Sequence, residues 1–198
     1  MSKFAAVLAC VICLPAVSPA MISTTRPDLV NVSGNLPLAF EPNRGQTDRV
    51  IDYVARGNGY SVFLKSSEAV LALRGANGTN PEFLRLTFKG GKMNAAPAAA
   101  ATLPGRSNYV RGRNPESWLQ DIPQFARVQY RQIYPGVDVV YYGNHGKLEF
   151  DFLIHSGADA DRIAITVDGA QKLTIDDTGD LHVAMTNGEV VQKWFFVY

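Results

Sequence analysis

Two carboxylates in the second half of the chain have a spacing that suits chemistry. Glu149 and Asp151 are separated by one residue within KLEFDFLI (147–154), so in a strand they project from one face about 7 Å apart. That distance matches the acid and base of an inverting glycoside hydrolase. The alternative, which we favour, is the charged, wetter face of an antiparallel strand, where such residues alternate with buried apolar ones.

A second polar group lies near the N-terminus, within FEPNRGQTD (40–48). Glu41, Asn43, Arg44 and Gln46 offer forked donors and acceptors that fit a sugar or a carboxylate. The same groups can instead satisfy irregular buried backbone, and we favour that structural role. Trp118 and several tyrosines offer rings on which a glycan could stack, although most aromatic side chains are expected in the core or in cross-strand pairs.

Known motifs for nucleophiles, nucleotides and metals do not accompany these groups. The sequence has no G-x-S-x-G, no P-loop and no G-x-G-x-x-G that opens a helix. The three histidines, His145, His155 and His182, are not spaced as zinc ligands, and no carboxylate pattern matches a calcium loop. We therefore expect no cofactor, no metal, no catalytic residues and no enzymatic activity.

The elements that must position these side chains are strands. Period-two alternation recurs between Gly- and Asn-rich turns, which predicts an all-β fold, an antiparallel β-sandwich or stacked sheets, with irregular loops and no substantial helix. Gly143-Asn144-His145-Gly146 tolerates positive φ and predicts a tight hairpin with an exposed His145. The expected strands cover 49–56, 60–65, 69–74, 83–89, 126–130, 137–142, 147–154, 162–168, 172–176 and 180–185.

Residues 90–105, GGKMNAAPAAAATLPG, interrupt the strand pattern. They are small and carry Pro97 and Pro104, so they predict a flexible connection between two strand groups, 36–89 and 106–198. The section that follows contains two further X-Pro steps and is expected to be an irregular excursion with Trp118 as its packing anchor.

The first twenty residues have the order of a secretory signal peptide. Lys3 precedes an apolar run to Val17, and Ser18-Pro19-Ala20 supplies small residues for cleavage. The run is shorter than the roughly 20 residues of a membrane-spanning helix. A lipoprotein alternative at Cys10 fits less well, because the apolar run continues past it.

These features indicate where the mature protein is located. We expect a secreted, extracellular or cell-surface protein, with the periplasm as an alternative, and no membrane span after cleavage of residues 1–20. A poorly ordered extension is expected over 21–35, before an all-β domain over 36–198. Both cysteines lie within residues 1–20, so the mature chain is expected to have no disulfide, and its stability must come from its core.

The charge balance argues against a nucleic-acid partner. The chain has 19 Lys and Arg and 18 Asp and Glu, and removal of residues 1–20 takes away Lys3 and no acid, which leaves a formal charge of zero. A neutral surface does not attract a phosphate backbone or an anionic membrane.

Five stretches, in order between residues 36 and 193, form a recognisable set. They are LPLAFEPNRGQTD (36–48), ARGNGYSVFL (55–64), LPGRSNYVRGRNPESW (103–118), ARVQYRQIYPGVDVVYYGNHGKLEFDFLIHSGADADRI (126–163) and DGAQKLTIDDTGDLHV (168–183). Together they resemble the N-terminal domain of large secreted bacterial proteins in which that domain precedes SBBP-type β-propeller repeats. The resemblance implies an extracellular all-β domain of unknown function, with propeller repeats downstream, and it supplies no catalytic residues. After Gln192 the chain departs from this pattern, so a domain shortened at its C-terminus is expected.

The leading hypothesis from the sequence is a non-enzymatic exported β-sandwich module with a structural, adhesion or assembly role. The alternative is a carbohydrate-binding or glycan-processing domain, and the expected partners are glycans or other cell-surface proteins. An open groove lined by aromatic rings and convergent carboxylates would favour the alternative. Burial of the same side chains would favour the structural role.

Overall fold

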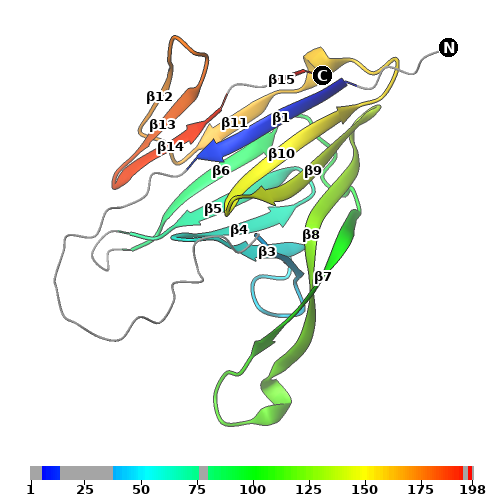
Figure 1. Ribbon diagram of the computed structural model, residues 1–198, viewed down its shortest axis with the longest axis vertical. Coiled ribbons are helices and arrows are strands. Elements are labelled where there is room, and N and C mark those ends of the chain that lie inside the picture. Colours follow the sequence, from blue (N-terminus) through cyan, green and yellow to red (C-terminus); the bar gives the residue numbers. More distant parts are fainter. Residues whose placement is uncertain (1–5, 14–37, 76–79, 194–195, 198) are drawn as a thin grey trace.

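The computed structural model describes residues 6–13, 38–75, 80–193 and 196–197, with the backbone alone for 6–13 and 196–197. The structure is 59% strand and 4% helix, and the residues that it describes form no helix of seven or more residues, which confirms the all-β prediction. A curled antiparallel sheet is joined by a small second sheet (Figure 1). Within the described residues, no helix has the length and hydrophobicity needed to cross a membrane.

The described residues form fifteen strands. They are β1 (Ala6–Cys13), β2 (Phe40–Pro42), β3 (Tyr53–Arg56), β4 (Tyr60–Lys65), β5 (Glu68–Leu73), β6 (Glu82–Phe88), β7 (Pro97–Tyr109), β8 (Leu119–Tyr134), β9 (Val137–Asn144), β10 (Lys147–Ile154), β11 (Ile165–Asp168), β12 (Lys172–Ile175), β13 (Leu181–Met185), β14 (Gly188–Gln192) and β15 (Phe196–Val197). Two 3₁₀ turns, η3 (Pro115–Ser117) and η4 (Ala160–Arg162), complete the list. The strand order is β11-β6-β5-β4-β3-β2-β8-β9-β10-β1-β14-β13-β12, while β7 pairs with β8 and β15 pairs with β1.

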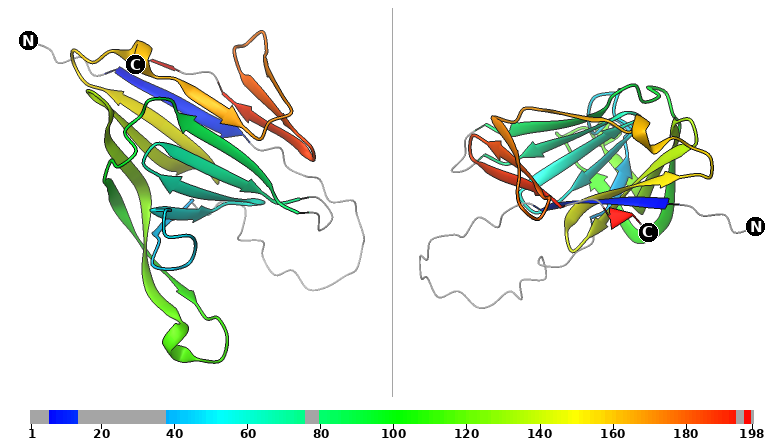
Figure 2. Two further views of the ribbon diagram at one scale, coloured as in Figure 1. Left: turned by 180° about the vertical axis from the view of Figure 1, so that it is seen from behind. Right: turned by 90° about the horizontal axis from the view of Figure 1, so that it is seen from above.

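The large sheet curls until its inner face meets itself, as the two views of Figure 2 show. Phe88 on β6 lies against rings from β9 and β10, with centroid distances of 6.5 Å to Tyr141, 6.0 Å to Phe150 and 5.2 Å to Phe152. All four side chains are buried. The inner faces of β13 and β14 add to the same core, so one hydrophobic interior holds both sheets together.

The β9–β10 hairpin follows its predicted course. β10 covers the predicted residues 147–154, and Asn144 pairs with Lys147 across the turn. The two loop residues, His145 and Gly146, have φ angles of 48° and 75°, the conformation that matches the twist of a two-residue hairpin. His145 is exposed, as the sequence predicts.

The predicted flexible connection over 90–105 is wrong for most of its length, because Pro97–Tyr109 forms β7 and pairs with β8. Alanines have no alternating pattern, yet their backbone groups can pair with a neighbouring strand as well as any others. Pro97 is the first residue of the strand and Pro104 lies in a register shift, the places where a sheet tolerates proline. The two expected strand groups are therefore parts of one sheet, in which β2 also pairs with β8.

The predicted irregular excursion is confined to a short turn between β7 and β8. Asn114 caps η3 by accepting a hydrogen bond from the Glu116 N–H at 3.1 Å, and Pro115 takes the first helical position. Pro123 lies inside β8, opposite Arg106 at the register shift. The X-Pro steps therefore mark the turn and a bulge within a hairpin.

Part of the predicted signal peptide lies in the sheet. β1 pairs with β10 over six positions, from Ala6 opposite Ile154 to Val11 opposite Glu149. Ile12 pairs with β14 on the other side. The rest of residues 1–20 and the expected extension over 21–35 lie outside the described residues.

We predict that His145→Asn raises the free energy of unfolding by about 0.5 kcal/mol, because asparagine occupies left-handed backbone at lower cost than most residues. Urea denaturation of the wild type and the variant measures the difference. His145→Val at the same position should lower stability, since a β-branched residue fits positive φ poorly. Equal stabilities for the three proteins would contradict this account of the turn.

Candidate functional site

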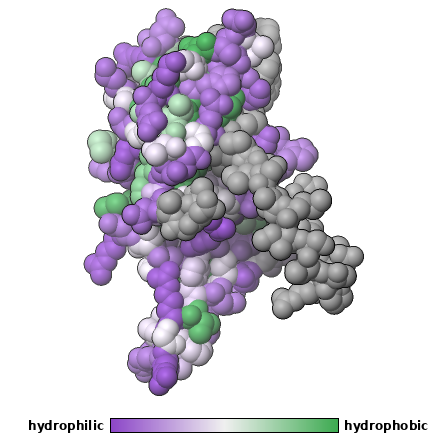
Figure 3. All heavy atoms as spheres, turned by 90° about the vertical axis from the view of Figure 1, so that its left-hand side faces the viewer, coloured by the Kyte–Doolittle hydropathy of each residue, from purple (hydrophilic) through white to green (hydrophobic). Residues whose placement is uncertain are grey.

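Glu41 lies where the β7–β8 hairpin leaves the sheet. The distal part of this hairpin, residues 107–122, is called the arm below, and it projects from the body of the molecule (Figures 1 and 3). Glu41 is in β2, which pairs with β3 on one side and with β8 through Phe40 on the other. It is only 7% exposed. A buried carboxylate needs partners, because its desolvation otherwise costs several kcal/mol.

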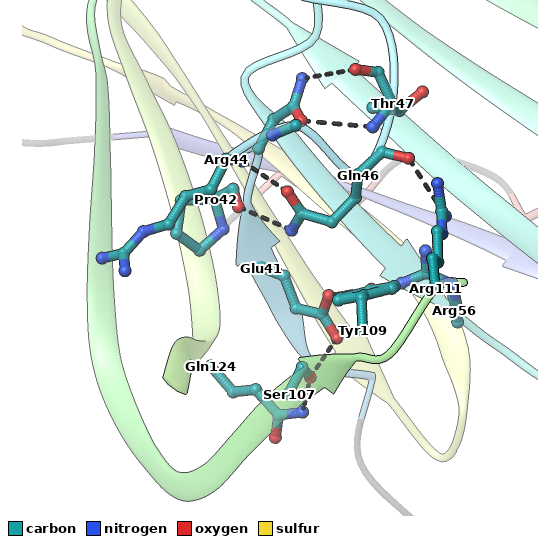
Figure 4. A network of polar contacts seen from close by, with 12 residues as sticks. Glu41, Pro42, Arg44, Gln46, Thr47, Arg56, Ser107, Tyr109, Arg111 and Gln124 are labelled. Carbon is teal, nitrogen blue, oxygen red and sulfur yellow. Dashed lines mark hydrogen bonds and ion pairs between the residues drawn. The ribbon is translucent and has the colours of Figure 1, made fainter. Parts of the chain in front are cut away.

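Three side chains supply those partners, as Figure 4 shows. Ser107 Oγ donates to Glu41 Oε1 at 2.5 Å, and the Tyr109 hydroxyl donates to Oε2. Arg56 Nη1 lies 3.3 Å from Oε2. Gln124 in turn donates to Ser107 Oγ at 2.8 Å. Because Ser107 and Tyr109 belong to β7, the carboxylate ties the base of the arm to β2.

The Tyr109 ring also contacts two arginines. The guanidinium carbons of Arg56 and Arg111 lie 5.1 Å and 5.7 Å from its centroid. Cation–π contacts of this kind contribute about 0.5–1 kcal/mol at exposed sites. Burial raises the pKa of Tyr109 to about 12, and the hydrogen bond to Glu41 adds to the rise. Tyr109 therefore remains a neutral hydrogen-bond donor at neutral pH.

The other predicted side chains of this region hold its own loop. Asn43 Nδ2 donates to two backbone carbonyls further along the loop, at 2.6 and 3.0 Å. Gln46 Nε2 donates to the Pro42 carbonyl at 2.9 Å, and its Oε1 accepts from the Arg44 N–H. The Arg44 side chain is exposed. Thus the Asn43 and Gln46 side chains form hydrogen bonds to backbone groups of their own loop.

Trp118 follows η3 at the end of the arm. Its indole Nε1 is enclosed, and no hydrogen-bond acceptor reaches it among the described residues. The ring is partly buried, as a packing anchor would be. An indole N–H without a partner costs about 1–3 kcal/mol, which the ring must offset by apolar contact.

Glu149 and Asp151 form a second cluster, on β10. The Tyr142 hydroxyl donates to Asp151 Oδ1 at 3.0 Å, and Asn144 Nδ2 donates to Glu149 Oε1 at 2.9 Å. The Arg127 guanidinium carbon lies 5.7 Å from the Tyr142 ring centroid. Burial raises the pKa of Asp151, and the hydrogen bond from Tyr142 opposes that rise.

The expected wet face of β10 is wrong at Glu149, which is only 6% exposed. The reason is the place of β10 within the sheet, between β9 and β1, so that Glu149 has a cross-strand neighbour on both sides, Tyr142 on β9 and Val11 on β1. Asp151 remains partly exposed.

Sequence reasoning missed the partners of Glu41 and a second buried carboxylate, Asp138. The latter accepts from the Gln132 N–H at 2.7 Å and from Gln129 Nε2 at 2.9 Å, and His155 Nε2 lies 3.2 Å away. Gln132 has a φ of 56° and lies in a register shift of β8. Asp138 therefore holds a bulge. No local motif signals either network, because the partners come from different strands.

A third cluster lies on the small sheet. His182 Nε2 is 3.0 Å from Asp176 Oδ2, and its Nδ1 is 3.1 Å from Glu189 Oε1. Asp176 Oδ1 accepts from the Thr178 hydroxyl and N–H at 2.7 and 2.9 Å. These hydrogen bonds hold the pKa of Asp176 below its usual value, with Thr178 the larger cause, and raise the pKa of His182, with Asp176 the larger cause.

The three clusters lie apart from the hollow that the described residues form. Among the described residues, no group of three or more His, Cys, Asp or Glu side chains could hold a metal ion. A hollow of about 320 Å³ lies at the start of β4 and the end of β5, lined by Gly59, Tyr60, Ser61, Ala72, Arg74, Gly75 and Pro81. That lining includes none of the site residues that the sequence analysis proposes.

We predict that Glu41→Ala lowers the free energy of unfolding by about 2–3 kcal/mol, because the Arg56, Ser107 and Tyr109 donors lose their acceptor. Urea denaturation measures the loss, and amide hydrogen exchange over residues 107–122 should become faster. Glu116→Ala, which removes an exposed glutamate of η3 in the arm, is the matched control and should change neither quantity. Similar behaviour of the two variants would show that Glu41 does not anchor the arm.

We predict that the stability of the small sheet depends on pH through His182 and Asp176. The raised pKa of His182 means that its stabilising effect is complete below the usual value of 6.5 and is lost as pH rises through the raised pKa. The lowered pKa of Asp176 means that its effect is complete above 3.8 and is lost as pH falls towards the lowered pKa. His182→Gln should therefore remove part of the fall in thermal stability between pH 5.5 and pH 8.5. His145→Gln, at the exposed turn, is the control and should leave that fall unchanged.

Comparison with known proteins gives one match. A family described as "Domain of unknown function (DUF7948)" matches residues 40–198, from β2 to the end of the chain. No curated protein and no solved structure matches. The matched region contains Glu41 and its partners, together with Glu149 and Asp151. The chain therefore belongs to the DUF7948 family of domains of unknown function.

Proposed function

We propose that this chain is a non-enzymatic, exported module of a bacterial cell-surface or secreted protein, with a structural, adhesion or assembly role. In this proposal the curled sheet is the scaffold and the arm is the element that contacts other surface molecules. The single observation that carries the proposal is the anchoring of the arm by the buried Glu41 carboxylate, which holds a projecting hairpin in a fixed direction.

The surface of the arm supports a contact role. Val110, in the turn between β7 and β8, is 62% exposed, and Arg111 and Arg113 beside it are exposed as well. The arm stands clear of the body in Figure 3. Arginine is enriched at protein interfaces, and here two exposed arginines follow an exposed apolar side chain.

The alternative, a carbohydrate-binding or glycan-processing domain, has weaker support. Glu41, Glu149 and Asp151 all accept hydrogen bonds from side chains of this chain. Of the aromatic side chains that might have formed a stacking platform, Tyr130 and Tyr141 are fully buried. Each internal contact occupies part of the acceptor capacity that a sugar would need. The carbohydrate-binding alternative can be tested as a sugar site at Glu149 and Asp151.

The first experiment follows export and surface retention of the full chain. The secreted chain should begin near Met21 by intact mass, and it should be retained on cells that express it. Val110→Ser with Arg113→Ser should reduce the retained fraction at least fivefold without a change in thermal stability. Phe83→Ser with Lys172→Ser, which alters exposed residues outside the arm, is the matched control. Retention that is insensitive to the arm variant would overturn the contact role.

A second experiment decides between the two functions. Glu149→Gln with Asp151→Asn should leave any binding to a glycan array unchanged, because both side chains serve the sheet. A tenfold loss of glycan binding in a variant that keeps its thermal stability would favour the carbohydrate-binding alternative.

A further inference from the structure

We propose that the space between β10 and β14 is a strand-accepting groove, and that in the exported protein it takes an extended strand from another polypeptide with basic residues at alternate positions. The proposal rests on the proposed function in one respect, the removal of residues 1–20 on export. It adds the position, the direction and the chemistry of the partner.

The groove is defined by the strand that fills it in the full chain. β1 runs antiparallel to β10 over six residues and antiparallel to β14 and β15 on its other side. It therefore bridges the large sheet and the small sheet, as Figure 1 shows. A strand from elsewhere that runs in the same direction as β1 would pair antiparallel with both neighbours, which is slightly more stable per residue than parallel pairing.

The strand that fills the groove is outside the domain that the family defines. The family match begins at residue 40, whereas β1 ends at Cys13. β1 also lies within the predicted signal peptide. Removal of residues 1–20 would leave the outer edge of β10 without a partner strand.

An open edge at β10 would be costly. Leu148, Phe150 and Phe152 on this strand are at most 1% exposed and belong to the central core. The strand is eight residues long and lies next to the core, so its unpaired N–H and C=O groups would form a ready template for another chain. Addition of a strand to such an edge is a general mode of peptide recognition, in which backbone hydrogen bonds give affinity.

Charge determines which strand fits. Glu149 and Asp151 are two residues apart on β10, and the register places Val11 and Ala9 of β1 opposite them. An uncharged strand thus leaves two carboxylates without a charged neighbour on that side. Residues directly opposite in an antiparallel pair share a face, so basic residues at these two positions would pair with the carboxylates. The groove therefore favours a partner strand with Lys or Arg at alternate positions.

The test uses the full chain with a weakened β1. Leu8→Pro with Ala9→Pro removes one backbone donor towards each neighbouring strand and should free the groove. The probe is a fluorescent eight-residue peptide with the β1 sequence AVLACVIC, carrying Cys10→Ser and Cys13→Ser together with Ala9→Lys and Val11→Lys. The matched control peptide carries Ala9→Glu and Val11→Glu in place of the two lysine changes.

Fluorescence anisotropy should show that the basic peptide binds the proline variant at least tenfold more tightly than the acidic peptide does. The difference should shrink at high salt, as expected for partly exposed charges. The unmodified full chain should bind neither peptide, because β1 occupies the groove. Equal binding of the two peptides, no binding to a folded proline variant, or equal binding to the unmodified chain would overturn the proposal. A proline variant that dimerises would show that a second copy fills the groove, which would also overturn it.

A second measurement keeps the proposal testable if the proline variant does not fold. In the full chain, Ala9→Lys should raise the thermal midpoint by about 1–3 °C and Ala9→Glu should lower it, because position 9 lies opposite Asp151. The same midpoint for both variants, or the reverse order, would show that this register does not exist. Neither result depends on export, so failure here is distinct from failure of the proposed surface role.

Discussion

Contact between aromatic rings from distant strands determines the shape of the large sheet. Phe88 comes from β6, whereas Phe150 and Phe152 come from β10, and the strand order places six strands between these two. Their rings can meet only if the sheet curls. Aromatic pairs at such distances contribute about 0.5–1.5 kcal/mol beyond the area that they bury. With no metal cluster among the described residues and both cysteines in β1, this interior is the main source of stability.

The curled sheet contains irregular backbone, whose hydrogen-bonding groups need partners other than the neighbouring strand. β8 is the longest strand, and it changes register against both β7 and β9. Asp138 accepts the N–H of Gln132 at one irregularity, and Glu41 accepts from Ser107 and Tyr109 near the other. Carboxylates are effective in this role because charged acceptors form hydrogen bonds about twice as strong as neutral ones. Glu41, one of the polar residues that first suggest chemistry, thus lies near a place where the sheet departs from regularity.

The parts of the fold that could be predicted are those in which neighbouring residues determine the structure. The β9–β10 hairpin depends on the alternation of KLEFDFLI and on the tolerance of Gly146 for positive φ, and both are visible in the sequence. β7 could not be predicted in this way. Its alanines and prolines show no alternation of polar and apolar residues. They form a strand because they pair with β8, whose residues are distant in the sequence, as Ala100 and Arg127 are. The same limit applies to the network of Glu41, whose partners Ser107 and Tyr109 are 66 and 68 residues distant.

Core-facing and peripheral side chains differ in their capacity for function. Side chains that face the core or hold bulges cannot change partners without a loss of stability, so the inner part of the sheet is poorly suited to bind other molecules. The groups with capacity for new contacts lie at the periphery, in the arm and along the strand edges. A chain of near-zero net charge has no general attraction to draw partners, so recognition has to come from local shape and local charge. In the proposed function the arm offers a fixed direction and exposed arginines. In the proposed strand exchange, the edge of β10 that removal of β1 would open offers backbone groups beside two carboxylates.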